Sequence, residues 1–97
     1  MIPEIAQIDR VIHEPARLLI MSILRNAGDA DFLYLQREGK FTQGNLSSHL
    51  VKLEEAGYVE IEKTFKGKVP LTICRSTAKG DAALADYSAR MLEILQR

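Results

Sequence analysis

The segment Phe41–Phe65, FTQGNLSSHLVKLEEAGYVEIEKTF, constrains the fold most strongly, because the spacing of its apolar residues changes at Gly57. Before this glycine the leucines follow helical spacing, at Leu46, Leu50 and Leu53. After it, valine and isoleucine alternate with two glutamates over residues 59–62, which is the pattern of a half-buried strand. The segment therefore predicts a helix joined to a strand with almost no linker.

The rest of the chain supplies the elements around this segment. Before it we expect three short helices: one over residues 4–12, one from Pro15 to Gly28, and one that Asp29 or Asp31 caps and Gly39 ends. After it, the turn Lys66–Lys68 and a second alternating run predict the returning strand of a hairpin. Thr77 can cap a last helix, over residues 77–96. This order predicts a mostly α, α+β fold: a winged helix-turn-helix with an added C-terminal helix.

Composition limits the function further. The 97 residues suffice for one domain, 1–97, with the winged-helix core at 15–75. The 13 basic and 13 acidic residues balance, so any electrostatic binding must come from a local patch. The single Cys74 can form neither an internal disulfide nor a multi-thiolate metal site. We therefore expect a cytoplasmic protein with no cofactor and no membrane span. Cys74 could respond to oxidants, or simply be a small buried apolar group.

Short polar side chains occupy the outer face of the helix that starts after Thr42. Gln and Asn can pair bidentately with adenine, Ser can bond bases or phosphate, and a glycine lets a backbone approach closely. A helix N-terminus also attracts phosphate. The chain from Thr42 onwards therefore predicts a DNA-reading helix, with the candidate contacts Thr42, Gln43, Gly44, Asn45, Ser47, Ser48 and Lys52.

The hairpin is the only clearly basic region of the sequence. Against Glu60 and Glu62 it carries three lysines, Lys63, Lys66 and Lys68, as well as Arg75. The lysines at the tip can reach phosphates or a minor groove, which positions a protein without reading sequence. Lysines at exposed strand edges also block aggregation, so a solvated edge is the alternative interpretation.

Four strings in the sequence resemble winged helix-turn-helix transcriptional regulators of the MarR/ArsR-like group, especially short single-domain members. They are IDRVIHEPARL, DADFLYL, FTQGNLSSHLVKLEEAGYVEIEKTFKGK and STAKG, and together they cover most of the chain. The resemblance implies a homodimer that binds double-stranded DNA at a pseudo-palindromic operator. Similar sequences often have a wing richer in arginine, whereas this chain has Val69 and Leu71. The cysteine pairs and His/Asp clusters of metal-sensing members are absent from the sequence, so metal sensing is disfavoured.

The resemblance also implies that the terminal helices form the dimer. The candidate interface residues are Ile5, Ile8, Ile12, Leu84, Tyr87, Met91, Ile94 and Leu95. In the last helix, Ala82, Ala85, Ala89 and Leu92 form a second stripe, so one stripe can pack inward and the other across a two-fold axis. A small-molecule effector, if there is one, is expected at this interface.

The sequence also bears on two other function classes, enzymes and protein-binding modules. Ser47, Ser48 and His49 are adjacent on a helix and point in different directions, so they make no catalytic triad, and we expect no enzyme. His49, beside the leucines, is expected to pack or to bond a neighbouring backbone group. A winged helix that binds another protein and has lost DNA binding is the serious rival, which the neutral net charge and the thin wing favour.

Overall fold

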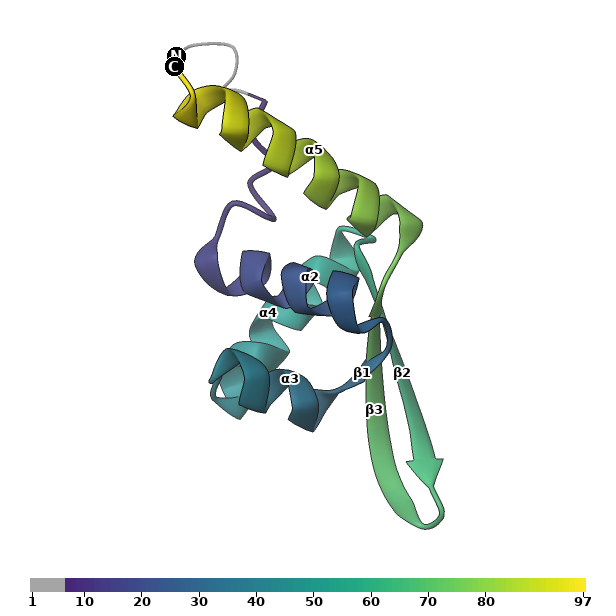
Figure 1. Cartoon of the computed structure of the whole chain (residues 1–97). Coiled ribbons are helices and arrows are strands. Elements are labelled where there is room, and N and C mark those ends of the chain that lie inside the picture. Colours follow the sequence, from purple (N-terminus) through teal and green to yellow (C-terminus); the bar gives the residue numbers. More distant parts are fainter. Residues whose placement is uncertain (1–6) are drawn as a thin grey trace.

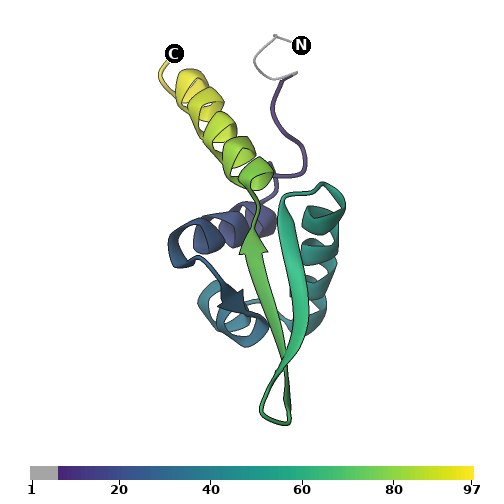
Figure 2. The same ribbon diagram turned by 90° about the vertical axis from the view of Figure 1, so that its right-hand side faces the viewer.

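The computed structural model describes residues 7–97 of the chain (Figures 1 and 2). Its helices are α2 (Pro15–Ala27), α3 (Phe32–Gly39), α4 (Gln43–Glu55) and α5 (Ala78–Leu95), and its strands are β1 (Ala30–Asp31), β2 (Val59–Lys66) and β3 (Val69–Ser76). The strands form one antiparallel sheet in the order β1-β3-β2. This arrangement confirms the predicted α+β winged helix with an added C-terminal helix. Over residues 7–97, no helix is both long and apolar enough to cross a lipid bilayer.

The segment before α2 differs from the prediction. Residues 7–14 form turns instead of the expected helix, and residues 4–6 lie outside the described part of the chain. The carboxylate of Asp9 accepts hydrogen bonds from the backbone N–H of Val11 at 2.8 Å and of Ile12 at 3.1 Å. Such local bonds compete with helical ones and stabilise a turn. The Tyr58 hydroxyl donates to the same carboxylate and ties this turn to the start of β2.

Most predicted helix ends are confirmed. Pro15 opens α2, and Gly28 ends it with φ +75°. Asp31, Thr42 and Thr77 cap the following helices, each accepting a backbone N–H three residues ahead. The end of α3 is the exception, because Lys40, with φ 55°, takes the left-handed position and Gly39 is the last helical residue.

Strand β1 was not predicted. Its two residues pair with β3 through Ala30–Cys74 and Asp31–Ile73. Two residues carry no periodic signal, so only their pairing partner far along the chain specifies the strand.

One apolar core joins all the layers. The three leucines of α4 are at most 2% exposed, and full burial of such a side chain stabilises the fold by about 1.5–3 kcal/mol. Beside them lie Ile12, Ile20, Met21, Leu24, Leu35, Val59, Cys74, Leu84 and Tyr87. At the start of α5, Gly80 comes so close to the chain that an added Cβ would lie 2.2 Å from the Tyr58 carbonyl oxygen. The base of α5 is thereby fixed on the body, while its C-terminal half extends away from the other helices (Figures 1 and 2).

Candidate nucleic-acid interface

The outer face of α4 is exposed, as the sequence predicted. Its solvent-facing residues are Gln43, Gly44, Asn45, Ser47, Ser48 and Lys52, and the cap Thr42 is exposed as well. Within residues 7–97, the polar side chains of α4 that precede His49 have no hydrogen-bond or ion-pair partner. No atom lies within 4 Å of a Cβ added to Gly44. The first two turns of α4 thus present unused donors and acceptors around a gap in the side-chain layer.

His49 holds the inner flank of α4 against α2. Its Nδ1 lies 3.2 Å from an Arg17 guanidinium nitrogen and 3.4 Å from a Glu14 carboxylate oxygen. The expected bond to a backbone group is therefore corrected to side-chain contacts. Partial burial would raise the pKa of Glu14, but the backbone N–H groups of Ala16 and Arg17, with the charges of His49 and Arg17, lower it below its usual value. Glu14 therefore caps α2 and fixes the orientation of α4 with one carboxylate.

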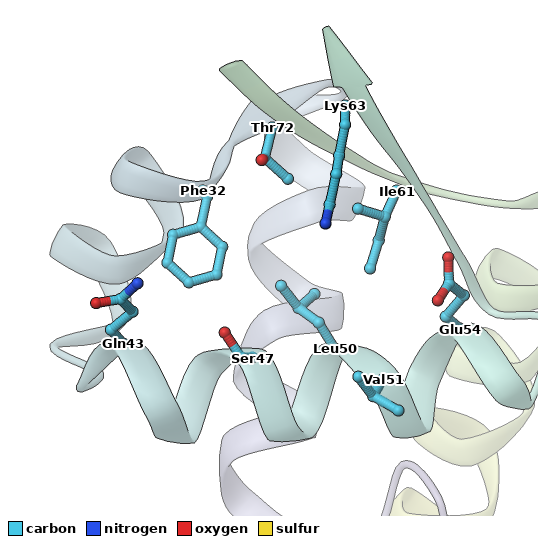
Figure 3. Close-up of a pocket in the computed structure, with 9 residues that line it drawn as sticks. All are labelled: Phe32, Gln43, Ser47, Leu50, Val51, Glu54, Ile61, Lys63 and Thr72. Atoms are coloured by element: carbon cyan, nitrogen blue, oxygen red, sulfur yellow. The ribbon is translucent and has the colours of Figure 1, made fainter. Parts of the chain in front are cut away.

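The wing, β2 and β3 with their turn (residues 59–76), extends well beyond the helices (Figures 1 and 2). Its strands pair in register from Val59–Ser76 to Lys66–Val69, and Gly67 turns the chain at the tip with φ +64°. Figure 3 shows Ile61, Lys63 and Thr72 on the face of the wing that looks toward α4.

A groove of about 640 Å³ separates α4 from this face of the wing (Figure 3). Lys63 enters it from the wing, while Gln43 and Ser47 border it from α4. Glu54 lines the far end of the groove, so this end is acidic. The apolar lining residues Phe32, Leu50, Val51 and Ile61 complete the groove together with Thr72. None of these five residues was predicted as a site residue. Thr72 could have been found from the sequence, because strand pairing places it opposite Lys63.

Arg75 does not add to the free positive charge of the wing. Its guanidinium bonds Asp29 at 3.0 Å and Glu62 at 3.1 Å, and it lies 3.9 Å from Glu60. The hydrogen bonds from Arg75 lower the pKa of the Asp29 carboxyl, and they raise the pKa of Arg75 itself. The arginine counted as basic from sequence is therefore a neutralised clamp between the base of the wing and the loop before β1.

The lysines of α4 and the wing differ from Arg75 in their contacts. Lys52, Lys63, Lys66 and Lys68 are exposed, and none forms an ion pair within the described part of the chain. Three of them follow the acidic base of the wing toward its tip, and the fourth lies on α4. These four lysines therefore place positive charge on α4 and along the wing. Elsewhere in the described chain, Arg10, Arg25, Arg37, Lys40 and Lys79 form no ion pair either.

The expected dimer residues separate into two groups. Ile8, Ile12, Leu84 and Tyr87 are buried in the core of the single chain, and Tyr87 also bonds His13 at 2.8 Å. Met91 and Ile94 pack partly against this core, whereas Leu95 is 72% exposed and Ile5 lies outside the described residues. The four buried residues have little surface left for a second copy, and the expected interface stays a prediction. The second stripe of α5, Ala82, Ala85, Ala89 and Leu92, is exposed along its length.

Redox or metal chemistry finds no support around Cys74. The thiol is fully buried, and burial, with the charge of Asp31 next, raises its pKa to about 11. Thiols react as thiolates, so burial and the raised pKa both disfavour reaction of Cys74 in the folded chain. Among residues 7–97, no three His, Cys, Asp or Glu side chains are grouped to hold a metal ion.

Comparison with known proteins agrees with this geometry. Residues 16–95 match the winged helix DNA-binding domain family. An uncharacterised protein of Methanocaldococcus jannaschii is 36% identical over 86 residues, which cover 88% of this chain and 92% of the relative.

Solved structures agree as well. The transcriptional regulator homologue protein from Pyrococcus horikoshii OT3 superimposes with a TM-score of 0.91 at 27% identity, over 98% of this chain and 96% of that one. Diamide-treated YodB from B. subtilis shares the fold at a TM-score of 0.81 and 22% identity, over 99% of this chain and 94% of its own. The fold and the family are those of DNA-binding regulators and not of enzymes. The chain belongs to the winged helix DNA-binding domain family.

Proposed function

We propose that the chain is a cytoplasmic transcriptional regulator that binds a pseudo-palindromic operator in double-stranded DNA as a homodimer. The observation that carries the proposal is a row of exposed side chains on the first turns of α4, next to the lysines of the wing; neither group has a side-chain partner within residues 7–97. A DNA duplex offers both partners that this surface lacks, namely base edges and phosphates.

In the proposed complex the N-terminal half of α4 enters the major groove. Gln43 and Asn45 are suited to adenine, and Ser47 and Ser48 to bases or phosphate. Gly44 allows the sugar–phosphate backbone to approach the helix start, where backbone N–H groups favour an anion. Lys63 faces the groove between α4 and the wing, so it would neutralise phosphate charge on a DNA strand that runs there.

The second copy would meet α5. The stripe Ala82, Ala85, Ala89 and Leu92 is exposed on a helix whose C-terminal half leaves the body of the molecule. Small side chains let two helices approach closely, and Leu92 and Leu95, 54% and 72% exposed, would supply apolar area. A two-fold axis there should place the two α4 helices about 34 Å apart, one turn of B-DNA.

Binding to DNA from the protein's own promoter region, followed by fluorescence anisotropy, tests the proposal. The double variant Ser48→Glu/Lys52→Glu puts acidic groups on the outer face of α4 and should abolish specific binding. The matched control Ala78→Glu/Lys79→Glu makes the same charge change at the exposed start of α5. If the α4 variant binds as tightly as its control, the docking is wrong. A stable wild-type dimer that binds no DNA at low salt would favour the protein–protein module instead.

A further inference from the structure

The tip of the wing is apolar as well as basic. Phe65 is 68% exposed and Val69 is 64% exposed, and Pro70 beside them is exposed too. Large exposed apolar groups that cluster at one end of a molecule mark a contact surface more often than chance. The lysines explain affinity for phosphate, but they leave these three side chains without a role.

Strand geometry places the two large apolar side chains, Phe65 and Val69, on opposite faces of the wing. Ile61 and Lys63 project toward α4 (Figure 3). Side chains alternate along a strand, so the period of two places Phe65 on the same face. Its cross-strand partner is Pro70, whereas Val69 pairs with Lys66 on the opposite face. The face of the wing that looks toward α4 therefore ends in a Phe65–Pro70 pair.

The position of this pair suits the groove next to the one that α4 would enter. Phe65 stands four residues beyond Ile61, about 13 Å at the rise of a strand. Half a turn of B-DNA, about 17 Å, separates a major groove from the neighbouring minor groove. Lys66 and Lys68, both unpaired within the described residues, flank the pair and would hold the phosphates on either side.

We infer that Phe65, backed by Pro70, is an apolar wedge that enters the minor groove and inserts between two stacked base pairs. The inference rests on the proposed DNA binding and adds to it a deformation of the duplex. Side chains of this kind unstack a base step and bend the duplex toward the major groove by about 20–90°. Flexible pyrimidine–purine steps would be favoured, which would give specificity at positions that α4 does not touch.

The test compares Phe65→Ala with Val69→Ala, two truncations of similarly exposed side chains on opposite faces of the wing. The probe is a duplex selected by the wild-type protein from a random library, labelled at both ends for energy transfer and carrying 2-aminopurine at the inferred step. The wild type and Val69→Ala should shorten the end-to-end distance and brighten the 2-aminopurine. Phe65→Ala should lose both signals and bind roughly 5- to 100-fold more weakly, and Phe65→Trp should restore them.

Each other outcome overturns the inference in a distinct way. If Phe65→Ala bends the duplex like the wild type, DNA binding stands and the wedge is wrong. If Phe65→Ala alters the sedimentation of the free protein and leaves bending unchanged, the patch is a contact between protein copies. If the wild type selects no duplex at all, the proposed function fails first, and the wedge with it.

Discussion

The salt dependence of DNA binding should change in a predictable way when the wing-tip lysines are neutralised. The variant is Lys66→Gln/Lys68→Gln, which keeps the length of both side chains nearly unchanged. Both residues are exposed and have no ion-pair partner within residues 7–97, so the folded chain loses no internal contact. Any effect on DNA binding therefore reports contacts with DNA.

The expected salt dependence follows from the number of lysines on the proposed DNA face that form no ion pair within the described residues. Lys52, Lys63, Lys66 and Lys68 on each of two copies give roughly eight phosphate contacts, and a slope of log K against log salt of about −7. The double variant removes about half of these contacts, so the slope should fall to about −3.5. If the affinities are nearly equal at 1 M salt, the affinity of the double variant near 0.1 M should be lower by up to about three-thousandfold.

Fluorescence anisotropy titrations across a salt series measure the slope directly. Lys79→Gln, at the exposed start of α5, removes a positive charge away from the proposed DNA face and is the control. Its slope should match the wild type, since only charges at the DNA surface release counterions. A double-variant slope equal to that of the control would show that the wing tip does not touch phosphate, and would remove half of the proposed contact surface.

Four further predictions concern single residues. Gly44→Ala should stabilise the chain by up to about 1 kcal/mol in urea unfolding, because the added methyl meets no atom, while DNA affinity falls. Gly80→Ala should destabilise it by about 1–3 kcal/mol in the same assay, because the methyl meets the Tyr58 carbonyl. Cys74, with its pKa raised to about 11, should react with a thiol reagent at pH 8 only upon unfolding. Arg75 lowers the pKa of Asp29, so the Arg75–Asp29 pair stabilises the fold above about pH 3.8 and stabilises it less as the pH falls. In Arg75→Gln the stability of the fold should therefore depend less on pH in this range, which acid unfolding followed by circular dichroism measures.

Local signals explain which features the sequence could predict. The caps at Thr42 and Thr77 and the stop at Gly28 each depend on bonds within a few residues, so composition and spacing suffice to locate them. The leucine stripe of α4 likewise fixes its buried face, and thereby its outer face. For this reason the sequence sufficed to predict the exposed face of α4 in the candidate site.

Long-range contacts explain what could not be predicted. Strand β1 exists because Ala30 pairs with Cys74, and the pairing of Arg75 with Asp29 joins the same two distant regions. Apolar spacing around Ile8 and Ile12 correctly indicated burial, but it could not say whether the partner was the chain itself or a second copy. The helical reading of that spacing failed because a single carboxylate, Asp9, captures two backbone N–H groups.

The distribution of charge along the wing argues for DNA contact over a merely solvated edge. An edge strand can be protected by charged side chains, lysines especially, at any point along its length. In this wing the carboxylates Glu60 and Glu62 lie at the base, where Arg75 pairs with them and with Asp29. The lysines continue to the tip without partners in the described chain. Paired charges at the base would hold the wing on the loop before β1, and the lysines toward the tip would remain free for phosphates. A neutral chain can thus offer a locally basic surface to DNA without an overall positive charge.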